Sequence, residues 1–339
     1  MPPTRASERP TAQQPQYTPA PATPPFIGEP GAHAHQPTPT PGNPDNRTTR
    51  KKRQRANITI ASLNMNGLSA LTQNLSPTDK WSMVNQTLNK YKIAVLALQE
   101  THLDDEMADR IRECYGKKMS IISSADPNNP RASAGVAFVI NKTLITPKKV
   151  STHELKEGRA LMIEIEWLET EKTRLVNVYA PNDRSAHPTF WEDLERTRID
   201  KGLARPDFVL GDFNVTEDPI DRAPPRLDDA RATEALRNLK HTWEVQDEWR
   251  KEHPEEKAFT YRANANGQQI LSCLDRIYVA RSRAQLTCDW NINPTPVPTD
   301  HWLVSTNYSP KEAPRIGNGR WTFPIQMLND KKLIRIIIE

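Results

Sequence analysis

The chain has 339 residues with a formal net charge of +4, and 36% of them are hydrophobic, which is low for a wholly globular protein. No apolar run approaches the roughly 18 residues of a membrane span, and the first residues lack the apolar segment of a secretory signal. Three widely spaced cysteines fit neither a disulfide ladder nor a zinc pattern. We therefore expect no membrane partner and a protein that is nuclear or cytoplasmic and not secreted.

Residues 1–56 differ in composition from the rest of the chain. They hold 13 of the 30 prolines and almost no aliphatic residues, so they cannot bury enough apolar surface to offset the entropy lost on ordering. We predict a disordered basic arm. Its eight Lys and Arg against three Asp and Glu give a net charge of +5, which leaves 38 against 39 for the remainder. The charge of the whole chain is therefore no indication that its folded part binds nucleic acid.

The arm ends in a basic run at residues 50–55, Arg-Lys-Lys-Arg-Gln-Arg. Such a run is typical of a nuclear-localisation signal or of a segment that contacts DNA phosphates. It is equally typical of a solvated linker, and the sequence favours neither interpretation.

A folded domain is predicted from residue 57 onwards. Residues 58–63 alternate and are rich in β-branched residues, which indicates a strand, and a helix with one apolar face is expected over 79–90. Residues 93–98 form a continuous apolar run of strand length, which is consistent with a buried strand. A short helix is predicted over 105–115.

The middle of the domain contains consecutive strands and no strict alternation of strands with helices. Strand-like runs occur at 119–123, 134–140, 160–167 and 174–179, separated in several places by turn residues. Helices are predicted over 188–201 and 228–240, and strands at 208–214, 274–279 and 303–306. This order predicts a mixed α/β domain at about 57–308, in which two sheets pack together with helices outside.

One short stretch, Gly211-Asp212-Phe213-Asn214, follows three apolar residues at the end of a predicted strand. Residues i and i+2 of an extended chain point to the same side, so Asp212 and Asn214 would project together while Phe213 turns into the core. A carboxylate beside an amide can orient a water molecule and hold a phosphate oxygen. The alternative is an ordinary Asx-turn after a strand, because these are also common turn residues.

Polar side chains with catalytic potential recur where apolar strands end or begin. Such loops at one edge of a sheet often carry function. The set is rich in carboxylates, contains one histidine and lacks a cysteine ligand set, which suits Mg²⁺ or Mn²⁺ better than zinc. It indicates metal-assisted hydrolysis of a phosphoester, and the chain contains neither a Gly-Xaa-Ser-Xaa-Gly elbow nor a Walker-type loop. Its members are Asn64, Glu100, Tyr179, Asp212, Asn214, Asp275, Asp300 and His301.

Taken together, these segments resemble the endonuclease/exonuclease/phosphatase superfamily, which has the DNase I-like fold. The resemblance is strongest to the apurinic-type endonuclease domain of LINE-type non-LTR retrotransposons. It implies a four-layer α/β/β/α sandwich with two mixed sheets, and a domain at 57–310. The matching pieces, in the family's order, lie at 62–68, 98–102, 134–137, 177–182, 211–214, 221–222, 274–278 and 299–301.

The resemblance also implies a role for each matching side chain. Glu100, Asn64 and Asp300 would hold the metal. Asp212 would activate the attacking water. Further catalytic roles fall to side chains that hold or contact the scissile phosphate, namely Asn214, Tyr179, and His301 oriented by Asp275. Substrate contacts are implied for Asn66, Thr260 and Arg222.

Three departures from the family pattern accompany these roles. Asn66 stands where apurinic repair enzymes often have Asp, Thr299 replaces a more usual Ser, and Cys273 replaces a common Arg. None of them removes a catalytic group that the resemblance implies.

The function that the resemblance implies is a Mg²⁺-dependent endonuclease that nicks DNA and leaves a 3′-hydroxyl to prime reverse transcription. Residues 311–339 are expected to be a linker or truncated C-terminal segment, in which 319–323 and 328–330 resemble the stretch that leads toward a reverse transcriptase in such elements. That polymerase would be a partner absent from this chain. Two alternatives remain. The domain could be a phosphatase on a small phosphoester such as an inositol phosphate or lipid headgroup, or a catalytically dead nucleic-acid-binding relic, since one fold serves several functions.

Overall fold

The computed structural model describes residues 56–67, 79–147, 149–166, 171–265, 267–311 and 313. All of these residues belong to one compact unit, Lys52–Glu339. The predicted basic arm up to residue 55 and the predicted C-terminal segment from residue 314 lie outside the described residues. Among those described, no helix is long and apolar enough to cross a membrane.

The first of two six-stranded sheets contains the N-terminal strands of the domain. Its central strands β1 and β2 run parallel, and its other pairings are antiparallel. In spatial order its members are β14 (Thr287–Asn293), β15 (Leu303–Tyr308), β1 (Ile58–Asn64), β2 (Ile93–Gln99), β4 (Val136–Asn141) and β3 (Met119–Ser124).

The second six-stranded sheet is also mixed. Its strands β7 and β8 are parallel, and the remaining neighbours are antiparallel. Its spatial order is β10 (Val245–Gln246), β13 (Asp275–Ala280), β8 (Phe208–Asp212), β7 (Lys172–Tyr179), β6 (Ala160–Glu166) and β5 (Lys149–Lys156). A hairpin of β11 (Tyr261–Ala265) and β12 (Gln268–Ser272) pairs with the short β9 (Arg222–Ala223) as a third sheet.

Aspartate side chains cap the first turns of several helices. Asp79 accepts a hydrogen bond from the backbone of Trp81, and Asp104 and Asp229 cap two further helices in the same way. The α-helices are α1 (Lys80–Lys90), α2 (Asp105–Tyr115), α3 (His187–Asp200), α4 (Ala230–Trp243) and the short α5 (Glu248–Glu252).

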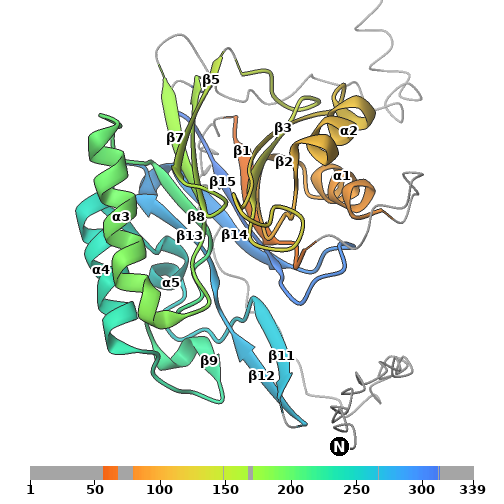
Figure 1. Ribbon diagram of the computed structural model, residues 1–339. Coiled ribbons are helices and arrows are strands. Elements are labelled where there is room, and N and C mark those ends of the chain that lie inside the picture. The colour runs from red at the N-terminus through yellow and green to blue at the C-terminus, as the bar shows by residue number, and fades with distance from the viewer. Residues whose placement is uncertain are drawn as a thin grey trace, which may run out of the picture. The chain divides into compact units, whose positions relative to one another are not determined.

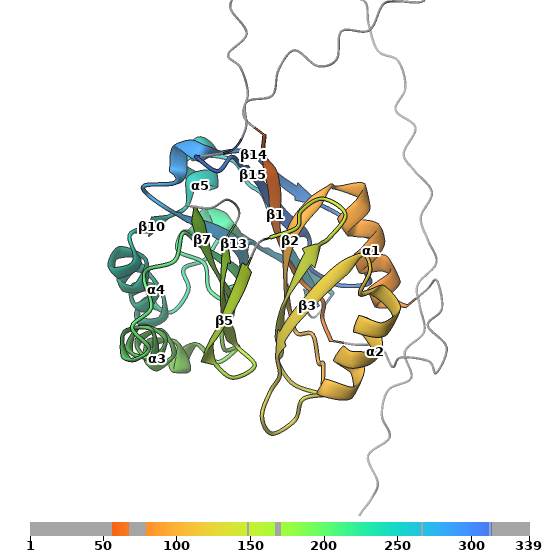
Figure 2. The ribbon, with the colours of Figure 1, turned by 90° about the horizontal axis from the view of Figure 1, so that it is seen from above.

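The unit has four layers, as predicted. Helices α1 and α2 cover one sheet, and α3 and α4 cover the other, with the two sheets face to face between them (Figures 1 and 2). A central hydrophobic core that includes Phe138, Leu175 and Leu210 lies between the sheets. Strand β2 is buried at every position because its side chains alternate between this core and the one beneath α1 and α2. This explains its continuous apolar sequence.

Strand direction gathers the site residues at one end of the sandwich. Strands β1, β2, β7 and β8 end there, while the antiparallel β13 and β15 begin there. Gly211 allows β8 to approach its neighbour closely, because its φ is +146° and a Cβ at this position would lie 1.9 Å from the carbonyl oxygen of Val178. The packing of β8 against β7 therefore determines where the next residue, Asp212, lies.

Candidate active site

The register of the second sheet aligns three of the predicted residues. Asp212 on β8 lies opposite Asp275 on β13 and opposite Tyr179 on β7. In the first sheet, Asn64 pairs with Gln99, so the following residue Glu100 emerges beside Asn64. Residues that are far apart in the sequence thus meet because their strands end at one level.

Two Asx-turns shape the strand ends. Asp212 and Asn214 both line one cleft, as predicted, but through the Asx-turn and not through an extended chain. The backbone N–H of Asn66 donates to Asn64 Oδ1 at 2.8 Å, and that of Asn214 donates to Asp212 Oδ1 at 2.9 Å. Asn66 and Asn214 both have positive φ values, near 50°, so neither continues its strand. Phe213 is fully buried, as predicted.

Asn64 links the two carboxylates from the two sheets. Its amide donates to Glu100 Oε1 and to Asp212 Oδ2, each at 2.9 Å. Glu100 has a φ of +49°, which is rare for a residue with a side chain and is characteristic of functional sites. In this arrangement the amide nitrogen of Asn64 faces the carboxylates, so Asn64 positions them.

His301 and Asp275 form a buried imidazole–carboxylate pair. His301 Nδ1 lies 2.8 Å from Asp275 Oδ2, so Nδ1 donates, and Nε2 lies 3.9 Å from Asp212 Oδ2 and 4.0 Å from Asp300 Oδ1. Thr260, predicted to touch the substrate, is fully buried, and its hydroxyl accepts hydrogen bonds from the N–H groups of Leu274 and Asp275. In this structure Thr260 holds Asp275 in place and does not line the cleft.

Burial and charge set the protonation of these groups. Burial raises the pKa of the Asp212 carboxyl to about 7, with the charge of Asp275 adding to the rise and His301 opposing it. Burial lowers the pKa of His301, but the charge and hydrogen bond of Asp275 outweigh it and raise that pKa to about 9. Burial and the charges of Glu100 and Asp212 raise the pKa of Tyr179. These shifts favour the protonated forms of the His301 imidazole and the Tyr179 phenol.

The side chains on the other flank form a second hydrogen-bonded group. Asn214 donates to Asn182 Oδ1 at 2.9 Å and to the backbone carbonyl of Ala180 at 2.9 Å. The hydroxyl of Tyr179 donates to the same Asn182 oxygen at 3.2 Å. Asn182 therefore holds Asn214 and Tyr179 together, a role that the sequence analysis did not assign to it.

Several of the side chains described above line a cleft of about 490 Å³. Asn66 is exposed and donates to Asp300 Oδ1 at 2.9 Å. Arg222 lines the cleft, although it is largely buried and forms an ion pair with Asp228. The lining residues include Asn66, Glu100, Asn182, Arg184, Asp212, Asn214, Arg222, Arg226, Tyr261, Asp300 and His301.

The donor atoms fit a hard divalent cation. Asp212, Asp275 and His301 bring three polar atoms within 4.8 Å of one another, and because the imidazole is paired with Asp275, the carboxylates are the oxygen donors of this group. The carboxylates of Glu100 and Asp300 line the same cleft, and no cysteine is among its described lining residues. One oxygen of Asp275 is buried without a hydrogen-bond partner among the described residues. An oxygen-rich set of this kind suits Mg²⁺ or Mn²⁺.

Lys80 and the pair Gln99–Asn177 support the site and were not predicted. Lys80 Nζ donates to the carbonyls of Met65, Asn66 and Gly67, at 2.8, 3.2 and 2.6 Å, and so anchors the loop after β1. A lysine in the first turn of a helix is unfavourable because it opposes the helix dipole. This unusual position is the signal by which the sequence could have identified Lys80. Gln99 Nε2 donates to Asn177 Oδ1 at 2.6 Å, which joins the two sheets behind the catalytic residues.

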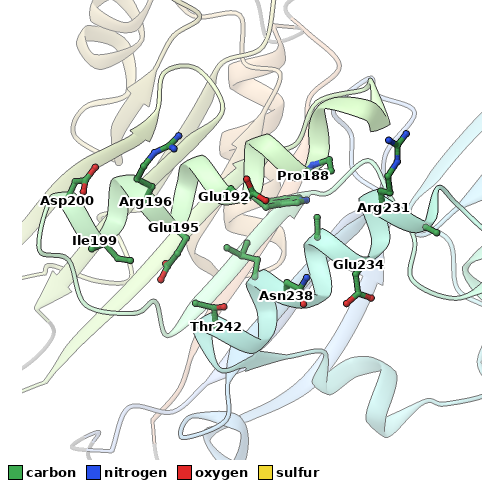
Figure 3. Close-up of a pocket in the computed structure, with 14 residues that line it drawn as sticks. Pro188, Glu192, Glu195, Arg196, Ile199, Asp200, Arg231, Glu234, Asn238 and Thr242 are labelled. Carbon is green, nitrogen blue, oxygen red and sulfur yellow. The ribbon is translucent and has the colours of Figure 1, made fainter.

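A larger cavity, of about 910 Å³, lies between α3 and α4 (Figure 3). Its labelled side chains come from these two helices and include Glu195, Ile199 and Asn238. None of the predicted site residues lines this cavity. Several of the predicted site residues instead line the smaller cleft at the strand ends.

Sequence comparison gives two findings. The sequence profile described as "Endonuclease/Exonuclease/phosphatase family" matches residues 61–301. A curated Xenopus laevis protein, "Transposon TX1 uncharacterized 149 kDa protein", is 32% identical over 208 residues, or 59% of this chain. The match spans only 15% of that much longer protein.

Solved structures confirm the predicted fold. The endonuclease domain of TRAS1, a telomere-specific non-LTR retrotransposon, matches with a TM-score of 0.52 and 14% identity over 74% of this chain and 98% of that chain. The AP endonuclease LMAP from Leishmania major matches with a TM-score of 0.58 and 17% identity over 75% of this chain and 88% of that one. An AP endonuclease from Archaeoglobus fulgidus gives 0.56 and 20%, over 74% and 99%. At these identities the likeness concerns the fold.

Proposed function

The chain belongs to the endonuclease/exonuclease/phosphatase family, and on this premise we propose that it is a metal-dependent endonuclease that nicks one strand of DNA. The observation that carries the proposal is the meeting of the Asn64–Glu100–Asp212 contacts with the Asp275–His301 pair in one open cleft. A base, a cation for the phosphate and an oxygen-rich metal site are the parts that phosphodiester hydrolysis requires.

Each residue has a defined task in this proposal. Asp212 takes a proton from a water molecule, which attacks phosphorus while the bond from phosphorus to the 3′ oxygen breaks. The cationic Nε2 face of His301 binds a phosphate oxygen whose negative charge grows in the transition state, and Asp275 keeps the ring oriented. Tyr179 and Asn214, which in this structure donate to Asn182, would exchange those hydrogen bonds for ones to the phosphate. The departing 3′ oxygen receives a proton and becomes a 3′-hydroxyl, while the phosphate stays on the 5′ end.

Glu100 and Asp300, with Asn64 as the positioning amide, would hold Mg²⁺ or Mn²⁺ at the cleft. When bound, the cation neutralises phosphate charge and polarises the phosphorus–oxygen bonds. The carboxylates of Glu100, Asp212 and Asp300 gather in one cleft and repel an anionic phosphate, and a bound divalent cation would offset that repulsion alongside His301 and the arginines of the cleft.

DNA is favoured as the substrate by the shape and charge around the cleft. Arg184 and Arg226 line it, as do Ala263 and Ile270 of the hairpin β11–β12. The hairpin extends beyond the sandwich (Figure 1). A long, charged polymer can use the two arginines through its backbone phosphates, whereas a small phosphoester would leave them unused. The relatives named above, a transposon protein and the endonuclease domain of a retrotransposon, support a nick that primes reverse transcription by a separate polymerase domain.

Supercoiled plasmid tests the proposal directly. The full chain with Mg²⁺ should convert it to open circles, EDTA should stop the reaction, and Asp212→Asn should lower the rate by about 10²-fold or more. Asp200→Asn, an exposed carboxylate at the end of α3, is the matched control and should keep the wild-type rate. Phosphate release from inositol phosphates without nicking would instead identify a small-molecule phosphatase, and DNA binding without either activity would identify a relic.

A further inference from the structure

The hairpin β11–β12 separates the catalytic cleft from a second pocket. Ala263, Ile270 and Ser272 line the catalytic cleft, whereas Arg262, Gln269 and Leu271 line the other pocket. This alternation is expected of two paired strands, whose side chains point to opposite faces. Tyr261, the first residue of the hairpin, lines both.

The second pocket is rich in aromatic rings. Its volume is about 550 Å³, within the range of roughly 300–1,000 Å³ that holds small molecules or parts of larger ones. The rings come from four separate segments of the chain, so their convergence is a product of the fold. They belong to Trp249, Phe259, Tyr261, Trp290 and Trp302.

Backbone hydrogen bonds connect this pocket to the catalytic histidine. The N–H of Trp302 donates to the carbonyl of Thr260 at 2.7 Å, and that of Arg262 donates to the carbonyl of Asp300 at 3.2 Å. The ring of Tyr261 lies 4.8 Å from that of His301, between centroids. His301 lines the cleft and the next residue, Trp302, lines the aromatic pocket, so the two pockets adjoin on opposite sides of one short segment.

Within the part of the chain that the structure describes, two tryptophans of the pocket are partly exposed or lack a hydrogen-bond partner. Trp302 is 40% exposed, although it is a large apolar ring, and Trp290 Nε1 is buried without a hydrogen-bond partner among the described residues. Two cations, Lys257 and Arg262, stand at the pocket, while the carboxylate of Glu256 contacts His253 at 3.0 Å. Aromatic faces with neighbouring cations are suited to a base and its phosphate.

We propose that this aromatic pocket binds an unpaired nucleobase of the DNA strand whose phosphate lies in the catalytic cleft, by stacking on Trp302 and its neighbours. The proposal rests on the proposed function in that it takes DNA as the substrate. It adds that the chain recognises unpaired nucleotides next to the cut. Stacking does not depend on base identity, because every base has a flat aromatic face. The pocket therefore distinguishes unpaired from paired nucleotides and does not distinguish one base from another.

The test compares two single-stranded oligonucleotides of equal length, one of thymidines and one of abasic residues with the same phosphates. The full chain is titrated into each by fluorescence anisotropy in EDTA. The ratio of the two dissociation constants isolates the contribution of the bases, because phosphate contacts, including those of any basic segment, are common to both. For the unchanged chain this ratio should be about tenfold in favour of thymidines.

Trp302→Ala should lower the ratio at least about threefold, and Trp302→Phe, which retains a ring, should preserve it. Ile199→Ala, an exposed apolar residue on α3, is the control and should keep the wild-type ratio. If Trp302→Ala does not fold, Trp249→Ala removes another ring of the pocket and should lower the ratio in the same way.

A ratio near one for the unchanged chain would overturn the proposal. A Trp302→Ala protein that loses affinity equally for both oligonucleotides would also overturn it. The ratio would then be unchanged, and Trp302 would have a structural role and no contact with the bases. Plasmid nicking is scored separately. Nicking with a ratio near one overturns only this pocket, and a base-dependent ratio without nicking overturns only the proposed endonuclease.

Discussion

His301 Nδ1 lies 2.8 Å from Asp275 Oδ2, and both side chains are at least 94% buried. Asp275 begins β13, and its own N–H is bound to the hydroxyl of Thr260, so the carboxylate that orients the imidazole is itself held in place. These two hydrogen bonds fix the orientation of the His301 ring. The two residues are therefore expected to act as one unit.

Asp275→Asn should lower kcat/KM for plasmid nicking by about 10²–10⁴-fold, because the neutral amide no longer stabilises the cationic imidazole. Adding His301→Ala to Asp275→Asn should cost little more, since residues that act together are not additive. The double-mutant cycle is measured by steady-state kinetics. Two full and additive losses would show that the residues act independently.

Lys80→Met should lower the nicking rate by about tenfold or more. The substitution removes the three hydrogen bonds that hold the loop bearing Asn66, and small displacements of catalytic groups are costly. Lys90→Met, at the exposed end of the same helix, is the matched control. Equal rates for the two variants would contradict the anchoring role of Lys80.

Asn177→Leu should lower the free energy of unfolding by about 3 kcal/mol. Asn177 donates to the carbonyls of Leu98 and Ala137 and accepts from Gln99, and leucine would leave these buried groups unpaired. Urea unfolding measures the change. Asn238→Leu on the exposed face of α4 should change it by less than about 0.5 kcal/mol. A stable Asn177→Leu protein would show that this network does not join the sheets.

Gly211→Ala should be more destabilising than Gly202→Ala. Both glycines have positive φ values, but a Cβ at Gly211 would meet the backbone of Val178 at 1.9 Å, while a Cβ at Gly202 meets nothing within 4 Å. Gly202→Ala carries only the backbone penalty, about 1–2 kcal/mol. Thermal unfolding of both variants checks the order, and a reversed order would contradict the close approach of β8 and β7.

Asp228 gives a pH-dependent stability. Burial would raise the pKa of Asp228, but the hydrogen bonds and charges of Arg222 and its neighbours outweigh burial and lower it. A carboxyl with a lowered folded pKa stabilises the protein above its unfolded pKa of about 3.9, and this contribution is lost as the pH falls through the folded pKa. Wild type should therefore exceed Asp228→Asn in unfolding free energy by a constant amount from pH 7 to 5, and by less below pH 4. A gap that widens on acidification would contradict the assignment.

Much of the fold was predictable because burial leaves a clear pattern. β2 lies between two cores, and α2 occupies the predicted residues 105–115. The strand β5 was missed because it is an edge strand, mostly exposed, whose polar sequence has no apolar alternation. The short β10 and the hairpin β11–β12 were missed for similar reasons, since their side chains contribute little to the cores.

The candidate site was predictable in its membership and not in its geometry. Strand-end polar residues identified Asp212, Asp275 and His301, which the structure brings together. Extended periodicity placed Asn214 beside Asp212, and both line the cleft, but the positive φ of Asn214 ends the strand and brings its amide to Asn182. Such contacts depend on pairing between distant strands, which one sequence does not display.

The end of the nicked strand tests the central claim most directly. Plasmid nicked by the full chain with Mg²⁺ is purified and offered to a DNA polymerase with labelled nucleotides, with and without prior phosphatase treatment. Cleavage between phosphorus and the 3′ oxygen predicts equal, immediate incorporation in both samples, because the 3′-hydroxyl is already free. Incorporation that requires the phosphatase would reveal a 3′-phosphate and would contradict the proposed reaction.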